Sequence, residues 1–494
     1  MGNAHSPGPP EPGGTSQSGL PPQTGSSRRP DPRLSGKLQN NIHFIELSAL
    51  FRKHGKKLYL VGGAVRDLVR GHEPHDWDLA TDAGPDTVIA IFRSLKPRVT
   101  VIPTGIKHGT LTVHYRDAEF EITTFRTDSD YRDGRHPESV VFTVSVEEDL
   151  SRRDFTMNAV ALELPRGKVV DPFGGLKDIK RTIIRCVGNP RKRFEEDGLR
   201  PLRAVRFAAQ LDFTVEKSTL QAIRPSLGVT AEVSQERIRD ELDKIIASPR
   251  PSLAFRLMEQ TGLLELVLPE LSACRGIEQK GYHHFDVLDH SLLACDYAAE
   301  KDFPVEVRIA ALFHDIGKPD TRQMDDRGIW TFYQHEKRSV KLTEHLMTRL
   351  RYPNSRIAEV CRLIACHMFH YEEVWSNGAV RRFIIRAGKE NLENLYRLRR
   401  CDTYGMTGTE TSPEGLAALV SRVDKVLAES QALSLKDLAV SGDDLIAAGI
   451  KPGKHMGIIL NELLETVVDD PDSNNPETLV NIALQFNTKY QTRP

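Results

Sequence analysis

The stretch Leu58–Thr81 reads LYLVGGAVRDLVRGHEPHDWDLAT, and its pattern decides the fold around it. It predicts a strand, a turn at Gly62–Gly63, a short helix and a second strand over Asp76–Ala80. Side chains alternate along a strand, so the carboxylates of Asp76 and Asp78 are expected on one face. Two carboxylates side by side repel each other unless a cation lies between them.

These two aspartates predict metal-assisted chemistry on a nucleotide. Mg²⁺ prefers hard oxygen ligands and leaves room for substrate phosphates. The glycine turn upstream lets the backbone approach a triphosphate closely. An Asp-x-Asp pair alone is usually a solvated strand edge, but GGAVRD stands upstream of this pair at strand–turn–helix–strand spacing. That combination favours a catalytic site over a solvated edge.

The composition narrows the class of protein. A chain of 494 residues is too long for one core, so about two to four domains are expected. It has 67 Lys and Arg against 68 Asp and Glu, so a polyanion site must come from local clustering of charge. Six cysteines without a Cys-x-x-Cys pair exclude a disulfide framework or zinc ribbon. No apolar run approaches the length of a membrane span, so we expect a cytoplasmic protein without a membrane partner.

The order of the patterns predicts an α/β head followed by helical domains. Residues 1–40 are rich in Pro, Gly and Ser and are expected to form a disordered tail. Residues 41–180 are expected to form a small α/β head with a mixed sheet. Its expected helices are 41–55 and Asp86–Leu95, and its expected strands are Lys57–Val61, Asp76–Ala80, Val99–Ile102, Thr110–Tyr115 and Ala118–Thr124. Mostly α-helical patterns follow, in a neck (181–275), a histidine-rich domain (283–405) and a C-terminal tail (414–490).

The head contains further candidates for the site. Glu121 lies between apolar residues of its strand and is a candidate third catalytic carboxylate, the alternative being an exposed strand glutamate. Arg152 and Arg153 offer forked donors suited to phosphate, the alternative being surface ion pairs. Asp154 and Asn158 are one helical turn apart and can address a ribose hydroxyl.

The neck carries an arginine stripe after an acidic residue. Arg200, Arg203 and Arg206 recur every third residue, and Asp197 precedes them. Pro201 is tolerated only in a first helical turn, so the helix is expected to start near Gly198. A carboxylate accepts from an exocyclic amino group and a guanidinium donates to ring acceptors, so Asp197 and Arg200 together can match the edge of a base. The alternative is an ordinary ion pair between these two side chains.

Six motifs in order resemble those of class II tRNA nucleotidyltransferases, the family of bacterial CCA-adding enzymes and poly(A) polymerases. They are LVGGAVRD, HDWDLAT, RRDFTMNA, DPFGG, EDGLRPLRAVRF and ERIRDEL, and they cover residues 40–270. The resemblance implies that Asp76 and Asp78 bind Mg²⁺ and that Asp197 and Arg200 select the incoming CTP or ATP. It also implies nucleotide contacts from Gly63, Arg66, Arg153, Arg203 and Arg206. The expected nucleotide site adds to these Gly62, Arg152, Asp154 and Asn158.

The same resemblance implies a reaction. The 3′-hydroxyl of tRNA attacks the α-phosphate in line, pyrophosphate leaves, and two metal ions assist. The segment Arg126–Phe142 is similar to a flexible loop of family members that add the terminal A, which favours CCA or A addition over CC addition alone. The leading interpretation is a CCA tRNA nucleotidyltransferase that binds tRNA, CTP and ATP. A poly(A) polymerase or an A-only enzyme is the alternative within the same class.

A second resemblance concerns residues 283–405. His290, His314-Asp315 within ALFHDIGKPDT, His335, His367 and Asp402 follow one another as in the HD phosphohydrolase superfamily. An adjacent His–Asp pair with a distant His and Asp suits a divalent metal that activates water. The resemblance implies a second divalent metal held by His290, His314, Asp315 and Asp402. The alternatives are a degenerate structural HD unit, an HD phosphohydrolase whose head binds RNA, and a non-catalytic RNA-binding protein.

Overall fold

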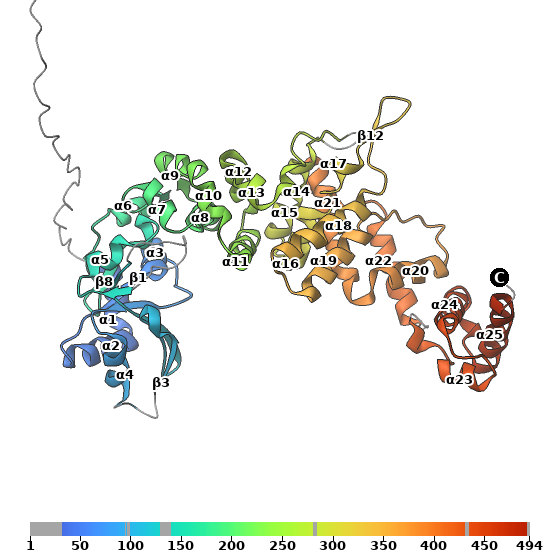
Figure 1. Cartoon of the computed structure of the whole chain (residues 1–494), viewed down its shortest axis with the longest axis horizontal. Coiled ribbons are helices and arrows are strands. Elements are labelled where there is room, and N and C mark those ends of the chain that lie inside the picture. Colours follow the sequence, from blue (N-terminus) through green and yellow to red (C-terminus); the bar gives the residue numbers. More distant parts are fainter. Residues whose placement is uncertain are drawn as a thin grey trace, which may run out of the picture. The chain divides into compact units, whose positions relative to one another are not determined.

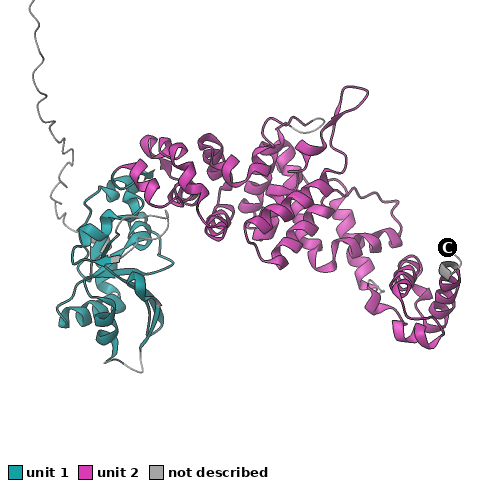
Figure 2. Cartoon of the chain, viewed as in Figure 1, with its two compact units in different colours: residues 1–130, 137–188 teal, residues 131–136, 189–494 magenta. Residues whose placement is uncertain are grey.

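The computed structural model describes residues 32–93, 95, 99–128, 140–279, 284–429 and 434–491. The chain divides into two compact units (Figure 2). Unit 1 comprises residues 1–130 and 137–188, and unit 2 comprises residues 131–136 and 189–494. Unit 1 contains the expected head, and unit 2 contains the expected neck, histidine-rich domain and tail.

The head is built on a mixed seven-stranded sheet of order β3–β4–β5–β2–β1–β8–β9 (Figure 1). β2 and β5 are parallel, and the other neighbours are antiparallel. The expected mixed sheet is therefore confirmed. Its strands are β1 (Leu58–Val61), β2 (Asp78–Thr81), β3 (Val99–Gly105), β4 (Thr110–Tyr115), β5 (Ala118–Thr124), β8 (Ala161–Glu163) and β9 (Lys168–Val170). The other elements of the head are α1 (Pro32–Asn40), α2 (Ile42–Lys53), α3 (Gly62–Arg70), α4 (Pro85–Arg93), β6 (Arg126–Asp128), β7 (Val140–Phe142), α5 (Val146–Ser151), the 3₁₀ turn η2 (Thr156–Asn158), α6 (Gly175–Lys180) and β10 (Ile183–Ile184).

Aromatic side chains fix helices α2 and α4 to the sheet. Phe44 and Phe51 of α2 and Phe92 of α4 are buried in the core of the head. The rings of Phe51 and Phe92 meet edge to face with centroids 5.9 Å apart, an arrangement favoured by the ring quadrupoles. The side chain of Asn41 caps α2 by accepting from the next backbone N–H groups, which fixes where this helix begins.

Three expected boundaries differ from the structure. Helix α1 occupies the end of the expected tail, because Leu38 is buried in the core of the head; residues 1–31 lie outside the described residues. β2 begins at Asp78 because a bend ends only after Asp76. The head extends to residue 188, because Val187 packs into one of its apolar clusters and Cys186 forms a β-bridge with the head.

Unit 2 is almost entirely helical. In the neck, α8 packs against α11 and α12. Its elements are α7 (Pro190–Glu196), α8 (Arg200–Leu211), β11 (Thr214–Val215), α9 (Lys217–Gln221), α10 (Leu227–Ala231), α11 (Gln235–Ile246), α12 (Pro251–Thr261), α13 (Leu263–Val267) and α14 (Pro269–Ser272).

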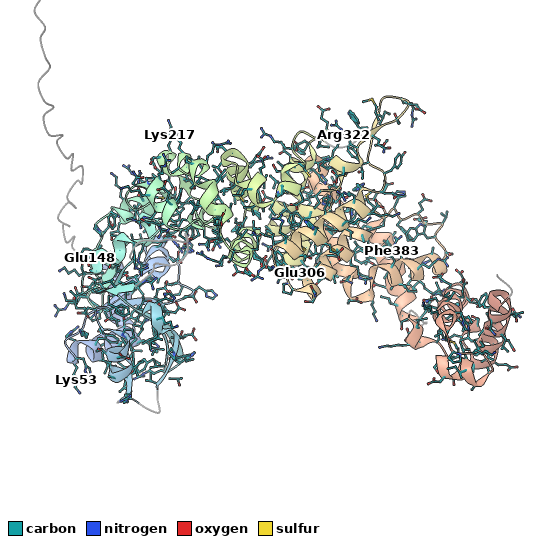
Figure 3. All side chains as sticks on the ribbon, in the orientation of Figure 1. Lys53, Glu148, Lys217, Glu306, Arg322 and Phe383 are labelled. Atoms are coloured by element: carbon teal, nitrogen blue, oxygen red, sulfur yellow. The ribbon has the colours of Figure 1, made fainter. Side chains whose placement is uncertain are left out.

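In the histidine-rich domain, α15 packs against α16 and α21, and α18 packs against α19. Its elements are α15 (Val287–Glu300), α16 (Val305–Phe313), α17 (Lys318–Thr321), β12 (Gln323–Met324), β13 (Trp330–Thr331), α18 (His335–Arg349), α19 (Asn354–Cys366), α20 (Asn377–Ala387) and α21 (Leu392–Thr407). Arg322, which precedes the β12–β13 hairpin (Figure 3), places its guanidinium 3.9 Å from the centre of the Trp330 ring.

The C-terminal tail has a core of its own, formed by residues between Leu438 and Ala483. Its helices are α22 (Leu416–Ala428), α23 (Gly442–Ala447), α24 (Lys454–Asp469) and α25 (Pro476–Gln491). Across the residues that the structure describes, every helix is too short or too polar to cross a membrane.

Candidate active site

Three carboxylates gather at the start of β2. Asp78 opens this strand, and Glu121 is its register partner on the parallel strand β5, so the two side chains share one face of the sheet. Asp76 lies in the bend before β2, and its side chain is 83% exposed. Burial raises the pKa of Asp78 to about 6, and Glu121 and Asp76 add to the rise. This repulsion is the kind that a bound cation relieves.

Gly62 brings the backbone close to this carboxylate. Its φ is +70°, in the left-handed region that favours glycine. A Cβ atom here would lie 3.1 Å from Nη1 of Arg153 and 3.2 Å from Oδ2 of Asp78. The structure thus brings together the predicted residues Gly62, Asp78 and Arg153, with no room for a side chain at the glycine.

A buried polar chain supports the neighbouring arginine. Nη1 of Arg66 donates to Oδ1 of Asn158 at 3.0 Å, and Nδ2 of Asn158 donates to Oδ1 of Asp154 at 3.1 Å. All three residues are buried. The expected α-helical turn between Asp154 and Asn158 is wrong, because the short 3₁₀ turn η2 joins them. Next to this chain, a Cβ atom on Gly63 would lie 3.3 Å from Nη2 of Arg66.

Asp149 of α5 binds both arginines of the RRD motif. Nε and Nη2 of Arg152 donate to its Oδ1 at 3.0 and 2.9 Å. Nη2 of Arg153 donates to its Oδ2 at 3.3 Å. Although burial raises it, the two arginines hold the pKa of Asp149 below its usual value. Since the shared partner is only 1% exposed, the alternative of ordinary surface ion pairs is wrong for both arginines.

In unit 2, the two predicted base-selecting residues lie where α7 ends and α8 begins. Both oxygens of Asp197 accept from Nη2 of Arg237 on α11, at 3.2 and 3.1 Å. Nη1 of Arg200 donates to Oε2 of Glu196 at 2.5 Å. Each of the two side chains is therefore held by an oppositely charged neighbour. Helix α8 begins at Arg200, slightly later than the expected start at Gly198.

The other two arginines of the stripe differ in exposure. Arg206 is buried, with Nε 3.2 Å from Oε2 of the buried Glu241 on α11. Its guanidinium also lies 4.2 Å from the centre of the Phe207 ring. Arg203 is 31% exposed and lies 3.9 Å from Glu241. Arg206 therefore ties α8 to α11, whereas Arg203 reaches solvent.

Four histidines and two aspartates meet in the core of the histidine-rich domain. All are buried: His290 on α15, His314 and Asp315 after α16, His335 on α18, His367 after α19 and Asp402 on α21. Residues on five helices, or directly after them, therefore lie together in space.

The two oxygens of Asp315 face two sets of histidines. Oδ2 lies 3.3 Å from Nε2 of both His290 and His314. Oδ1 lies 3.2 Å from Nε2 of His335 and 3.9 Å from Nε2 of His367. The Nε2 atoms of His290 and His314 are 3.0 Å apart. Nitrogen atoms this close need a proton or a cation between them.

Backbone carbonyls orient three of the rings. Nδ1 of His314, His335 and His367 lies 2.9, 2.9 and 2.7 Å from the carbonyl oxygen three residues earlier. With Nδ1–H donating there, a neutral ring carries a lone pair on Nε2 that points into the cluster. Burial lowers the pKa of His367 to about 3, so this ring is neutral. Imidazole and carboxylate ligands in this arrangement fit a divalent transition metal.

Comparison with known proteins assigns the chain to a family. Family models match residues 58–185 (poly(A) polymerase head domain), 212–274 ("probable RNA and SrmB-binding site of polymerase A") and 324–483 (tRNA nucleotidyltransferase domain 2). A CCA-adding enzyme of Lactobacillus helveticus is 35% identical over 428 residues, which are 86% of this chain and 92% of the relative. The chain belongs to the CCA-adding enzymes. The expected class, a nucleotidyltransferase that completes tRNA with CCA, is therefore confirmed.

Two further comparisons support the assignment of this chain to the CCA-adding enzymes. One from Geobacillus stearothermophilus is 48% identical over 212 residues, which are 43% of this chain and 51% of the relative. The crystal structure of the Bacillus stearothermophilus CCA-adding enzyme in complex with CTP has a TM-score of 0.66 and 30% identity. The matched region covers 93% of this chain and 99% of the Bacillus stearothermophilus chain.

Sequence reasoning missed several side chains of this CCA-adding enzyme. Arg237 and Glu241 stand one helical turn apart in the ERIRDEL motif, a spacing that places both on one face of α11. Asp149 precedes the RRD motif by one turn. His335 and His367 were present in the HD-like order but were not among the expected metal ligands, because only the adjacent His–Asp pair and its distant partners signalled a metal.

Proposed function

We propose that this enzyme transfers nucleotides from CTP and ATP to the 3′ end of tRNA at the carboxylates of the head. Asp76 and Asp78 are the metal ligands, and Glu121 is the third catalytic carboxylate. The observation that carries the proposal is the half-buried Asp78, whose pKa is raised to about 6 by burial first and by the two other carboxylates next. Together with Gly62 and Arg153, it forms a site for a cation and a phosphate.

The residues fit Mg²⁺. One carboxylate is half-buried beside a glycine backbone and another is exposed, so the cation would keep open positions for water and substrate phosphates. When bound, Mg²⁺ lowers the pKa of the attacking hydroxyl and neutralises the phosphate oxygens. Asp76 and Asp78 would hold it, and Glu121 would supply further negative charge on the same face of the sheet.

The protein's own groups position the triphosphate. Gly62 and Gly63 allow the backbone to approach it, while Arg66 and Arg153 present guanidinium groups fixed by Asn158 and Asp149. Fixed donors align the α-phosphate with the attacking hydroxyl without reorganising during the reaction. Arg152 and Asp154 support this arrangement through their buried hydrogen bonds.

Base selection belongs to the neck. The carboxylate of Asp197 accepts from an exocyclic amino group, which both cytosine and adenine carry, and the guanidinium of Arg200 donates to a ring acceptor. Arg237 and Glu196 hold these two side chains in place. Arg203 reaches solvent and is the member of the stripe suited to phosphate, whereas Arg206 supports α8 through Glu241.

Sequencing of the product tests the proposed function. A tRNA that lacks its CCA end is incubated with CTP, ATP and Mg²⁺, and the new 3′ end is sequenced. Addition of C, C and A supports the proposal. A single A or a long A tail would instead support the A-only or poly(A) alternative. The cytoplasm is the proposed place of action, since all six cysteines are free thiols, as in proteins of reducing compartments.

The buried histidine cluster supports a second candidate function, a metal-dependent phosphohydrolase. His290, His314, Asp315 and Asp402 would hold one divalent cation. His335 and His367 would hold a second through the other oxygen of Asp315. A bound cation of this kind lowers the pKa of water for attack on a phosphate ester.

Metal content separates this candidate from a degenerate structural unit. The purified enzyme is loaded with Mn²⁺ or Ni²⁺, freed of loose metal and analysed by elemental mass spectrometry, with Asp402→Asn as the comparison. Retained metal that the variant loses, together with hydrolysis of a 2′,3′-cyclic nucleotide, supports the second function. A chain that retains no metal contradicts it.

A further inference from the structure

We propose that Asp149 is a positioning residue for nucleotide transfer, and that it acts by holding Arg153 beside Asp78. The inference rests on the proposed function of the head carboxylates. Asp149 lies on α5, next to Glu148, which Figure 3 labels. It is buried, so its role is to fix other groups and not to contact the substrate.

The guanidinium of Arg153 reaches in two directions. Its Nη2 donates to Oδ2 of Asp149 at 3.3 Å. Its Nη1 lies on the other side, 3.4 Å from the carbonyl oxygen of Asn158 and 3.1 Å from where a Cβ atom of Gly62 would stand. Oδ2 of Asp78 borders the same point at 3.2 Å. Asp149 therefore holds one end of the fork, and the other end borders the same point beside Gly62 as the carboxylate of Asp78.

Asp149 is itself placed firmly enough for this role. The side chain of Ser145 caps α5 by accepting from a backbone N–H, and Leu150 is buried in the head. Arg152 occupies Oδ1 of Asp149, which leaves Oδ2 to Arg153. The backbone N–H of Arg126, where β6 begins, also approaches Oδ1 at 3.4 Å. One carboxylate thus joins α5, the RRD motif and the start of β6.

An arginine side chain without such an anchor samples many rotamers, and a forked donor binds well only when its plane is fixed. Loss of the Asp149 charge would leave Arg153 attached by a single weak contact to the Asn158 carbonyl. We therefore expect the triphosphate to bind less well and to be aligned less well for transfer, as small misplacements of positioning groups reduce rates strongly.

A double-mutant cycle tests this role. Asp149→Asn keeps the shape and removes the charge, and it is expected to lower kcat/KM for CTP by about tenfold to a hundredfold. If Asp149 acts through Arg153, the double variant D149N/R153A is as slow as R153A alone. Arg153→Lys keeps the charge but lacks the forked guanidinium, and it is expected to lower kcat/KM for CTP as much as D149N does. Because this variant leaves Asp149 unchanged, it replaces D149N in the test if D149N folds poorly.

Asp178→Asn is the matched control. Asp178 is also a buried carboxylate of the head, and it accepts from Thr156 and Arg185 at 2.7 and 3.1 Å. The fold-losses in kcat/KM caused by D178N and by R153A are expected to multiply in the double variant, as they do for independent sites. Wild-type kcat/KM in D149N, or effects of D149N and R153A that multiply, would overturn the inference. Activity retained in an Asp78 variant would instead contradict the proposed function itself.

Discussion

At the residue scale, Gly62 links backbone geometry to chemistry. Its positive φ and the atoms around it both exclude a side chain. Gly62→Ala must displace either Asp78 or Arg153, so we expect kcat/KM for CTP to fall by about a hundredfold. Single-turnover incorporation of labelled CMP measures this. Gly71→Ala is the control, because Gly71 also has a positive φ but a Cβ atom there would meet no other atom within 4 Å; it should cost stability and leave the rate of incorporation unchanged.

The pKa of Asp78 predicts how Mg²⁺ binding depends on pH. Burial, with Glu121 and Asp76, raises this pKa to about 6. Below that pH the carboxyl group is protonated and neutral, so affinity for Mg²⁺ should fall as pH decreases through about 6. Calorimetric titration with Mg²⁺ from about pH 8 down to about pH 5 measures the fall. Affinity that stays constant across this range would contradict the assignment.

If Asp197 selects the base as proposed, its pairing with Arg237 makes base choice depend on α11. Arg237→Ala removes the group that holds both oxygens of Asp197, so the ratio of CTP to ATP incorporation should change by about tenfold. The same ratio should change by a similar factor in Arg200→Ala. Arg239→Ala is the control, because Arg239 lies on the same helix and pairs with the exposed Asp240. A ratio that stays at the wild-type value in Arg237→Ala would refute the role of Arg237.

At the scale of elements, the alternation of apolar residues and the turn residues predicted most of the strands and helices of the head. β4 and β5 lie at the expected residues, because their apolar alternation matches a half-buried sheet. The predicted start of β2 was wrong by two residues, because His75 and Asp76 form a bend that periodicity does not reveal. The contact of Arg237 with Asp197 was not predictable, since it joins segments far apart in the sequence. The pairing of Asp149 with Arg152 and Arg153 is local, and sequence reasoning overlooked it.

Close packing of α6 against η2 leaves no room for a side chain at another glycine. A Cβ atom on Gly175 would lie 2.1 Å from the carbonyl oxygen of Thr156 and 2.5 Å from Val160. Gly175→Ala is therefore expected to destabilise the head by about 2–3 kcal/mol. Thermal unfolding measures this loss, with Gly84→Ala as the control, because nothing lies within 4 Å of the corresponding position there. An unfolding temperature equal to that of the wild type would contradict this prediction, because it would show that η2 moves to accommodate the methyl group without loss of stability.

At the scale of the whole molecule, each unit carries chemistry of its own. Unit 1 contains the carboxylates and arginines that we propose for nucleotide transfer, and unit 2 contains the residues that we propose for base selection and the histidine cluster. The order of motifs in the sequence predicted that the four histidines and two aspartates of unit 2 lie together, as they do. It did not predict that Asp315 faces two sets of histidines, because that depends on how five helices meet in the core.

The most direct test of the central claim compares Asp78→Asn with the wild type on a tRNA that lacks its CCA end. Single-turnover incorporation of CMP and AMP is measured with Mg²⁺ in excess, and thermal unfolding confirms that the variant is folded. The account predicts a complete C-C-A end from the wild type and a loss of at least about a thousandfold in rate for the variant. A folded Asp78→Asn variant that incorporates nucleotides at the wild-type rate would contradict it.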